Sequence, residues 1–136
     1  MITYRHDPGI GALLFVASGP LELQEYRALM AELLRVDYDR LATNFVWDLR
    51  GIDPASISTS DIIAVAEMSR PVLRSHGTNW VSALVVQNDL QFGLARMVES
   101  FIGVQGDSEI RVFKDFDQAV EWVATCRRCS WQPSVL

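Results

Sequence analysis

The chain has 136 residues, 49% of them hydrophobic and 21% charged, a composition typical of one globular domain and not of a disordered or membrane protein. Twelve Lys and Arg against seventeen Asp and Glu give a net charge of −5, which repels phosphate backbones, so we expect no nucleic-acid partner. The longest apolar run, 12–17, is shorter than the ~20 residues of a membrane span, and the first residues do not resemble a secretory signal. We therefore expect a cytoplasmic protein of bacterial type without a membrane span.

The first two elements are predicted to form a β-hairpin. Residues 2–6 alternate apolar and polar side chains as a half-buried strand does, and Asp7, Pro8 and Gly9 are typical of a turn. Residues 12–17 are continuously apolar, which predicts a buried strand that pairs back on the first.

Helices and strands alternate over the rest of the chain. Apolar residues recur every three or four positions in the predicted helices, whereas the predicted strands are short apolar runs. In chain order the predicted elements are a helix that starts at Ser18–Pro20 and ends near Arg35, a strand at 45–49, a helix from about Ser58 that Pro71 kinks or restarts, a strand at 80–86, a helix capped by Asn88 and Asp89, a strand at 110–113 and a final helix capped by Asp115.

This order, β-β-α-β-α-β-α-β-α, predicts an α/β fold, because strands that alternate with helices form parallel crossovers. We expect a single domain over 1–129 with a mixed, mostly parallel five-stranded sheet, whose first two strands form an antiparallel hairpin. Residues 130–136 are expected to form a C-terminal tail.

Four segments carry a resemblance to a known group of proteins. They are VWDLRGID at 46–53, the serine-rich helix start after it, FGLARMVESF at 92–101 and RVFKDFDQAVEWV at 111–123. The chain resembles, from Thr3 to Val123, the STAS-like superfamily of small bacterial proteins, which is related to anti-sigma-factor antagonists. The resemblance is closest to a branch whose members mostly lack an assigned function and whose architecture is also compared with the CRAL-TRIO lipid-binding fold.

The serine-rich stretch has two interpretations. In anti-sigma-factor antagonists a serine in this turn is phosphorylated by a partner kinase, and the resemblance places the acceptor near Ser58, although Ser56 and Thr59 replace the Asp and Gly of that turn. The residues themselves favour a structural role, because Ser58 followed by Asp61 three positions later is typical of a capping box at a helix start.

Two arginines are candidates for holding an anionic headgroup. Arg50 follows the third predicted strand, and Arg96 lies on the third predicted helix, near the carboxyl ends of the strands where open α/β sheets place their ligands. The alternative, which we favour, is that Arg96 pairs with Glu99 or Asp89 on the surface.

The third predicted helix also carries candidate apolar ligand residues. Phe92, Met97 and Phe101 recur at helical spacing and are expected to belong chiefly to the core. They would line a lipid-like pocket if this helix moved away from the sheet, a movement that Gly103 and Gly106 in the following loop would permit.

No set of residues predicts catalysis or metal binding. Cys126 and Cys129 have CxxC spacing, but they stand at the end of a helix, where the dipole opposes a thiolate, and we expect ordinary reduced cysteines. His6 and His76 have no visible nucleophilic partner and are expected to be solvated. We predict no enzyme, no metal and no cofactor.

Two functions remain open, and we favour the first. The first is a non-enzymatic interaction or regulatory module that docks a protein partner or a second copy of itself as a homodimer. It rests on aromatic residues that exceed what so small a core easily encloses, namely Tyr26, Trp47, Trp80, Trp122 and Trp131. The second is a carrier of a small apolar or lipid-like ligand in a CRAL-TRIO-like pocket.

Overall fold

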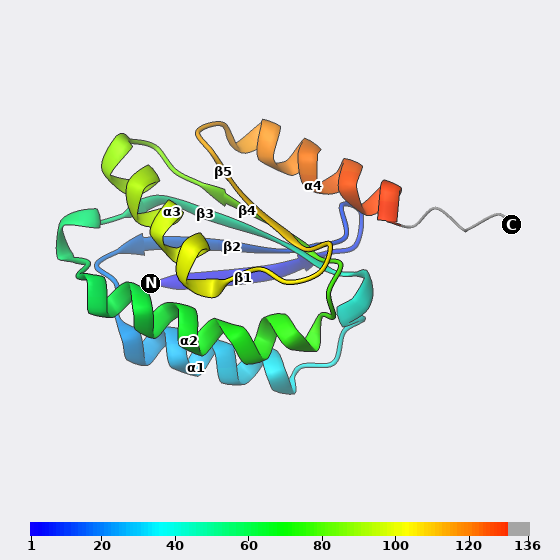
Figure 1. The fold of residues 1–136 in the computed structure, drawn as a ribbon, viewed down its shortest axis with the longest axis horizontal. Coiled ribbons are helices and arrows are strands. Elements are labelled where there is room, and N and C mark those ends of the chain that lie inside the picture. Colours follow the sequence, from blue (N-terminus) through cyan, green and yellow to red (C-terminus); the bar gives the residue numbers. More distant parts are fainter. Residues whose placement is uncertain (131–136) are drawn as a thin grey trace, which may run out of the picture.

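The computed structural model describes the backbone of residues 1–130 and the side chains of residues 1–126 (Figure 1). Its elements are β1 (Ile2–Asp7), β2 (Ala12–Gly19), α1 (Leu23–Arg35), β3 (Asn44–Ile52), α2 (Thr59–Ser75), β4 (Val81–Val85), α3 (Asp89–Ile102), β5 (Glu109–Phe113) and α4 (Phe116–Ser130), with short 3₁₀ helices at Arg40–Ala42 and Pro54–Ser56. The predicted order of strands and helices is confirmed. The predicted tail, 130–136, lies outside the described residues beyond Ser130.

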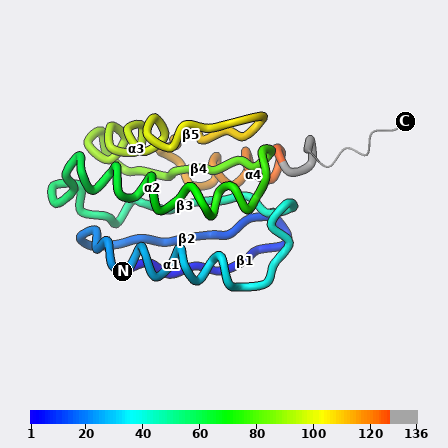
Figure 2. The backbone as a smooth tube through the Cα atoms, turned by 60° about the horizontal axis from the view of Figure 1, so that its bottom comes forward, coloured from blue at the N-terminus to red at the C-terminus, as the bar shows by residue number. Residues whose placement is uncertain are grey.

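The five strands form one mixed sheet in the order β1-β2-β3-β4-β5, in which only the β1–β2 pair is antiparallel. Because this order follows the chain, every crossover runs in the same direction, and right-handed crossovers then place their helices on one face. Helices α1, α2 and α3 accordingly lie side by side along one face of the sheet, and α4 lies against the other (Figure 2).

The sheet therefore separates two cores, which we call the three-helix side and the α4 side. On the three-helix side, Phe15, Phe45 and Trp80 pack with residues of α1, α2 and α3. On the α4 side, the buried residues are mostly small or β-branched, and they are Ala12, Leu14, Val46, Val81, Ala83, Val85, Ala119 and Val123. Successive residues of a strand point to opposite faces, so neighbours such as Ala83 and Leu84 belong to different cores.

The predicted start of the first helix was wrong, and so was a restart of the second helix at Pro71; the alternative, a kink at Pro71, stays a prediction. Helix α1 begins at Leu23 with Glu22 as its N-cap, not at Ser18–Pro20, because β2 continues to Gly19, which turns the chain with a φ of 75°. Helix α2 runs through Pro71 to Ser75 without restarting, since a proline this late in the helix interrupts the bonding of one turn only.

Within the described residues, no helix combines the length and apolar character that a membrane crossing requires.

Candidate functional site

A cavity of about 130 Å³ lies on the three-helix side, between the sheet and helices α1, α2 and α3. Its wall is almost entirely apolar. The lining residues are Tyr26, Met30 and Leu33 on α1; Ile62, Val65, Ser69, Val72 and Leu73 on α2; Gln91, Leu94, Ala95, Val98 and Ile102 on α3; and, from the strands and loops, Ile2, Ala17, Leu21, Phe45, Trp47, Leu49, Ile52, Ile57, Ser82, Leu84, Val86 and Ile110.

Few polar groups reach the cavity wall, and most of them are already hydrogen-bonded. The hydroxyls of Tyr26 and Ser69 lie 2.6 Å apart, and Ser69 Oγ also donates to the Val65 carbonyl at 2.7 Å. Burial raises the pKa of Tyr26 to about 12, against the opposing effect of the hydrogen bond with Ser69, so the phenol stays neutral. Ser82 adds a hydroxyl that makes no hydrogen bond to other described residues.

Gln91 holds the start of α3 against the end of β3. Its side-chain amide donates to the carbonyls of Arg50 and Ile52 at 3.1 and 3.0 Å, and its Oε1 accepts from the backbone N–H of Gln87 at 2.7 Å. The Gln91 side chain is buried and satisfies backbone groups where the sheet ends. This clamp fixes one end of the helix that covers the cavity.

At the other end of α3, Arg70 of α2 donates to the carbonyls of Phe101 and Ile102. These are carbonyls that the end of a helix leaves without intrahelical partners. Helix α3 is therefore tied at both ends over the cavity.

The cavity's size and wall determine what it can hold. Apolar cavities of about 150 Å³ stay dry and bind molecules such as benzene or xenon. A cavity of 130 Å³ with this lining therefore accommodates a single ring or a short branched alkyl group. An extended acyl chain requires a larger opening, because ligand pockets for drug-sized molecules are typically about 300–1,000 Å³.

The candidate ligand residues chosen from the sequence do not line this cavity. Phe92 and Met97 are half-buried, and Phe101 is exposed, whereas the lining face of α3 is Gln91, Leu94, Ala95, Val98 and Ile102. Helix α3 is apolar on two faces, so hydrophobic spacing alone does not decide which face turns inward. A polar residue, Gln91, marks the inner face because it serves the carbonyls of β3.

The two candidate arginines lie on opposite sides of the sheet. Arg96 forms an ion pair with Glu99 at 3.3 Å, which confirms the surface alternative. Arg50 belongs to the α4 side, where its guanidinium lies 5.3 Å from the centre of the Phe116 ring. The sheet order explains the separation, since without a reversal of strand order there is no crevice in which both residues meet.

Arg50 lines a second, polar hollow of about 470 Å³ at the carboxyl ends of the strands, together with Ser18, Asp48, Gln87 and Lys114. Its Nε and Nη2 donate to the two carboxylate oxygens of Asp48 at 2.9 and 2.8 Å. These hydrogen bonds hold the pKa of Asp48 below its usual range. An anion that bound Arg50 here would first have to displace Asp48.

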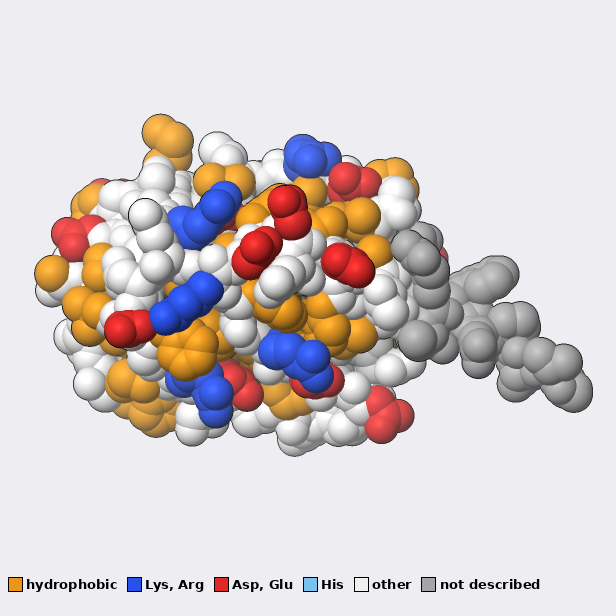
Figure 3. Space-filling view, turned by 90° about the horizontal axis from the view of Figure 1, so that it is seen from above, with side chains coloured by type: hydrophobic (Ala, Val, Ile, Leu, Met, Phe, Trp, Pro, Cys, Tyr) orange, Lys and Arg blue, Asp and Glu red, His pale blue; other side chains and the backbone are white. Residues whose placement is uncertain are grey.

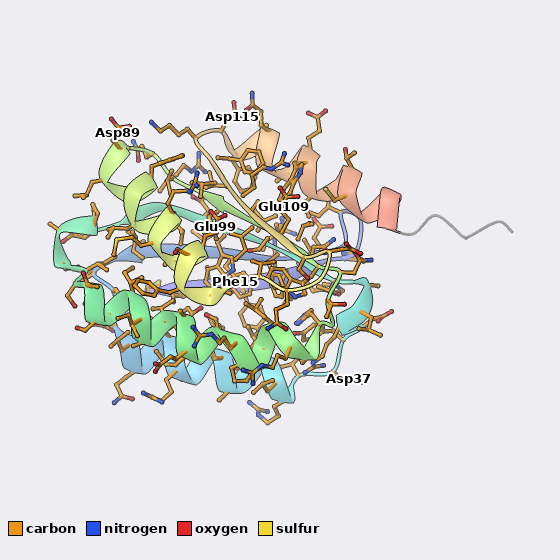
Figure 4. All side chains as sticks on the ribbon, in the orientation of Figure 1. Phe15, Asp37, Asp89, Glu99, Glu109 and Asp115 are labelled. Atoms are coloured by element: carbon orange, nitrogen blue, oxygen red, sulfur yellow. The ribbon has the colours of Figure 1, made fainter. Side chains whose placement is uncertain are left out.

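Lys114, at the other side of this hollow, lies 2.6 Å from Asp89 at the start of α3. Figure 4 shows Asp89 and Asp115 at the starts of α3 and α4, while Asp37 lies at the opposite end of the molecule. The positive end of the helix dipole stabilises a carboxylate at a helix start, which accounts for Asp89 and Asp115 without a ligand.

The serine-rich stretch forms the predicted cap. Ser58 Oγ accepts from the Asp61 N–H at 3.2 Å, and Asp61 Oδ2 accepts from the Ser58 N–H at 2.9 Å, so the capping box is confirmed. Such a cap typically contributes ~1 kcal/mol. Ser56 donates to the Asp53 carbonyl, and Thr59 is the first residue of α2; both are exposed. Phosphorylation of these residues stays a prediction.

The structure corrects the prediction for one histidine. His6 is exposed, but His76 is only 2% exposed and packs against the rings of Phe45 and Tyr38, whose centroids lie 4.6 and 5.5 Å away. Its Nδ1 donates to the Val72 carbonyl at 2.9 Å, and its Nε2 is buried without a hydrogen-bond partner among the described residues. The loop position suggested solvent, whereas aromatic side chains of neighbouring elements close over the ring.

The aromatic residues expected at an interface are mostly internal. Tyr26 and Trp80 are buried, and Trp47 stacks on Phe15 with ring centroids 3.8 Å apart. Trp122 packs on Phe113 at 5.5 Å and lies under the Arg111 guanidinium, and Trp131 lies outside the described residues. A sheet covered on both faces encloses more aromatic area than the chain length suggested.

The remaining candidates do not form a site. Among the described residues, no three His, Cys, Asp or Glu side chains gather closely enough to hold a metal ion. Cys126 packs half-buried on the α4 side, while the side chain of Cys129 lies outside the described residues. Gly106 serves close packing, because a Cβ there would lie 2.7 Å from Thr78 Cβ; the movement predicted for this loop is not tested.

No protein-family model and no curated protein matches the chain. Among solved structures, the chain is similar to an uncharacterized protein from the DUF3478 family with a SpoIIAA-like fold from Shewanella loihica PV-4. The two are 22% identical, the match covers 90% of this chain and 92% of that chain, and the TM-score is 0.58. At this identity the likeness establishes the fold alone. The chain therefore has a SpoIIAA-like fold, as the STAS-like resemblance of its sequence predicted.

Proposed function

We propose that this chain is a non-enzymatic binding module of a bacterial cytoplasm, and that its ligand is a small apolar molecule held under α1, α2 and α3. The observation that carries the proposal is the 130 Å³ cavity with its almost wholly apolar wall. Of the two functions that the sequence leaves open, the carrier of a small ligand is thus the better supported. The cavity's volume narrows that ligand from a lipid to a molecule of about the size of one ring.

The energetic cost of the cavity supports this proposal. Unfilled volume in a core lowers stability by about 24 cal/mol per Å³, so a cavity of this size forgoes about 3 kcal/mol. That is a large fraction of the roughly 5–15 kcal/mol by which domains are stable. A ligand that fills the space recovers part of this stability, which couples binding to the rigidity of α3.

The test is to add benzene or toluene to the protein and record methyl chemical shifts and melting temperature. We expect the methyls of Leu33 and Val72 at the cavity wall to shift, while those of Val46 and Val123 on the α4 side stay in place. Each kcal/mol of ligand stabilisation should raise the melting temperature by roughly 3–5 °C in a domain of this size.

Two variants control this experiment. Ala95→Leu fills the cavity from α3 and should abolish both the shifts and the stabilisation. Ala31→Leu makes the same change on the exposed face of α1 and should leave both intact. If benzene changes the methyl chemical shifts of both cores alike, or of neither core, the cavity is not the binding site. Native mass spectrometry of the untreated protein then identifies the natural ligand by its added mass.

A protein-interaction module is the second candidate. The observation that favours it is a row of apolar side chains on the outer surface of α3, where Leu90 is 57% and Phe101 is 38% exposed. Aromatic residues are enriched at interface centres, where charged residues are depleted. Native mass spectrometry across a concentration series tests this candidate, because a module of this kind associates without a bound small molecule.

A further inference from the structure

The outer surface of α3 carries a stripe of residues that belong to neither core, which we call the α3 stripe: Leu90, Gly93, Met97 and Phe101. Their spacing of three and four residues places them on one face of the helix. The inner face, which lines the cavity, consists of other residues. On the side of the molecule seen in Figure 3, hydrophobic side chains reach the surface between charged ones.

Gly93 is the unexplained member of this stripe. It lies inside a helix, where glycine is less favourable than alanine. It is exposed, and a Cβ at this position would meet nothing within 4 Å, so nothing in the folded chain requires glycine. Glycine on an exposed helix face permits the close approach of another backbone or side chain.

The stripe supplies both a gap and a side chain that fits it. Met97, one turn after Gly93, is a flexible apolar side chain that fills irregular gaps well. When two copies of α3 cross antiparallel with Gly93 of each against Met97 of the other, Leu90 of each comes close to Phe101 of the other. The same four residues of each copy thus form the contact, as a two-fold interface requires.

The charged pair on the rest of α3 is compatible with this arrangement. Arg96 and Glu99 neutralise each other at 3.3 Å, and Glu99 lies in the last turn of α3 (Figure 4). Two copies therefore meet at the stripe without a net local charge from this pair. Asp115 lies at the start of α4, away from the centre of α3.

We propose that the α3 stripe is the contact through which two copies of this chain form a two-fold dimer, with Met97 of each copy seated over Gly93 of the other. This goes beyond the cavity proposal and does not depend on it. It rests on the second candidate function, protein interaction, for which it names the partner. One helix face buries little area, so the dimer is weak, and its dissociation constant lies in the micromolar range or above.

The first test is sedimentation equilibrium between about 10 µM and about 1 mM, the range in which small interfaces associate. The wild type should dimerise. Gly93→Ala should weaken dimerisation at least tenfold and yet raise the urea midpoint of unfolding, because alanine favours the helix and meets no neighbour. Ala28→Leu, on the exposed face of α1, should leave dimerisation unchanged.

The second test checks the antiparallel register. Leu90→Lys and Phe101→Glu should each weaken self-association at least tenfold. A 1:1 mixture of the two variants should restore a heterodimer, because the new lysine of one copy then faces the new glutamate of the other. The second contact of the pair, between the unchanged Leu90 and the unchanged Phe101, is kept.

Two outcomes would overturn the proposal. One is a wild type that stays monomeric up to about 1 mM, which would assign the stripe to a different partner. The other is a dimer that is indifferent to Gly93→Ala and to the paired charges, which would place the interface elsewhere. Failure of this proposal leaves the response of the cavity methyls to benzene unaffected, so the two proposals fail separately.

Discussion

The two faces of the sheet are packed in different ways. On the α4 side, one helix lies on alanines and valines, and Ala83, Ala119 and Val123 are fully buried. On the three-helix side, large residues such as Phe15, Phe45 and Trp80 pack against three helices, and a cavity of 130 Å³ remains. Figure 4 shows Phe15 between the sheet and these helices.

The difference shows where this fold has room for a ligand. Small side chains let one helix approach a sheet closely, and the resulting contact leaves little free volume. Where three helices meet over one face of a sheet, large side chains in a few allowed rotamers must fill the space between them. Free volume remains at the junction of the helices, where these side chains do not fill the space completely. The cavity thus follows from placing three crossovers on one face, which the strand order dictates.

Two neighbouring residues of β4 should show the difference in packing between the two faces most strongly. Ala83 faces the α4 side, and Ser82 lines the cavity. Ala83→Leu should lower the free energy of unfolding by about 3 kcal/mol, because a packed core resists added methylenes. Ser82→Leu should cost less than about 1 kcal/mol or stabilise, since it fills free volume and breaks no hydrogen bond to a described residue.

Urea unfolding of both variants checks this expectation. The pair is matched, because both changes introduce leucine into the same strand one residue apart. Equal losses at the two positions would mean that both faces are packed to the same density, and the cavity would then be closed in solution.

The clamp of α3 over the cavity is the next feature to test. Gln91→Ala removes the donor to the Arg50 and Ile52 carbonyls and the acceptor for the Gln87 N–H. Because Gln91 is buried and these hydrogen bonds are partly buried, we expect a loss of about 2 kcal/mol, measured by urea unfolding. Hydrogen exchange of the α3 amides should also become faster.

Gln87→Ala is the matched control, since that side chain is exposed and only its backbone N–H takes part in the clamp. It should change stability by less than about 0.5 kcal/mol. If the two alanine variants unfold alike, then Gln91 does not hold the helix.

Much of this fold was predictable from the sequence. Hydrophobic periods indicated the order of the strands and helices, and the chemistry of capping identified Ser58 with Asp61 as the start of α2. Asn88 likewise caps α3 through the Gln91 N–H. These features are local, so the residues that decide them lie within a few positions of one another.

The cavity was not predictable in the same way. It depends on residues of all five strands and three helices, and no short motif encodes a gap at their junction. Phe92, Met97 and Phe101 do not line this cavity, because α3 is apolar on two faces and another face turns inward; the pocket predicted for a displaced α3 stays a prediction. The signal that identifies the inner face is Gln91, whose partners lie in β3, about forty residues earlier in the chain.

The three-helix side also contains a buried titratable group, because the imidazole of His76 packs against Phe45. Burial lowers the pKa of His76 below its ordinary value of 6.5, and the charge of Arg40 acts in the same direction, against the hydrogen bond to Val72. Well above pH 6.5 the ring is neutral in both the folded and the unfolded state, and its titration has no effect on stability there.

The sign of the effect at lower pH follows from these states. As the pH falls through 6.5, the unfolded chain takes up a proton that the buried ring resists, so stability declines until the folded pKa is passed. We expect urea unfolding to show lower stability at about pH 5.5 than at about pH 7.5, and His76→Gln to remove much of that difference. His6→Gln, at an exposed position, should retain it. A wild type and a His76→Gln variant with the same pH dependence would show that the ring is hydrated in solution, and that this end of the three-helix side is open to water.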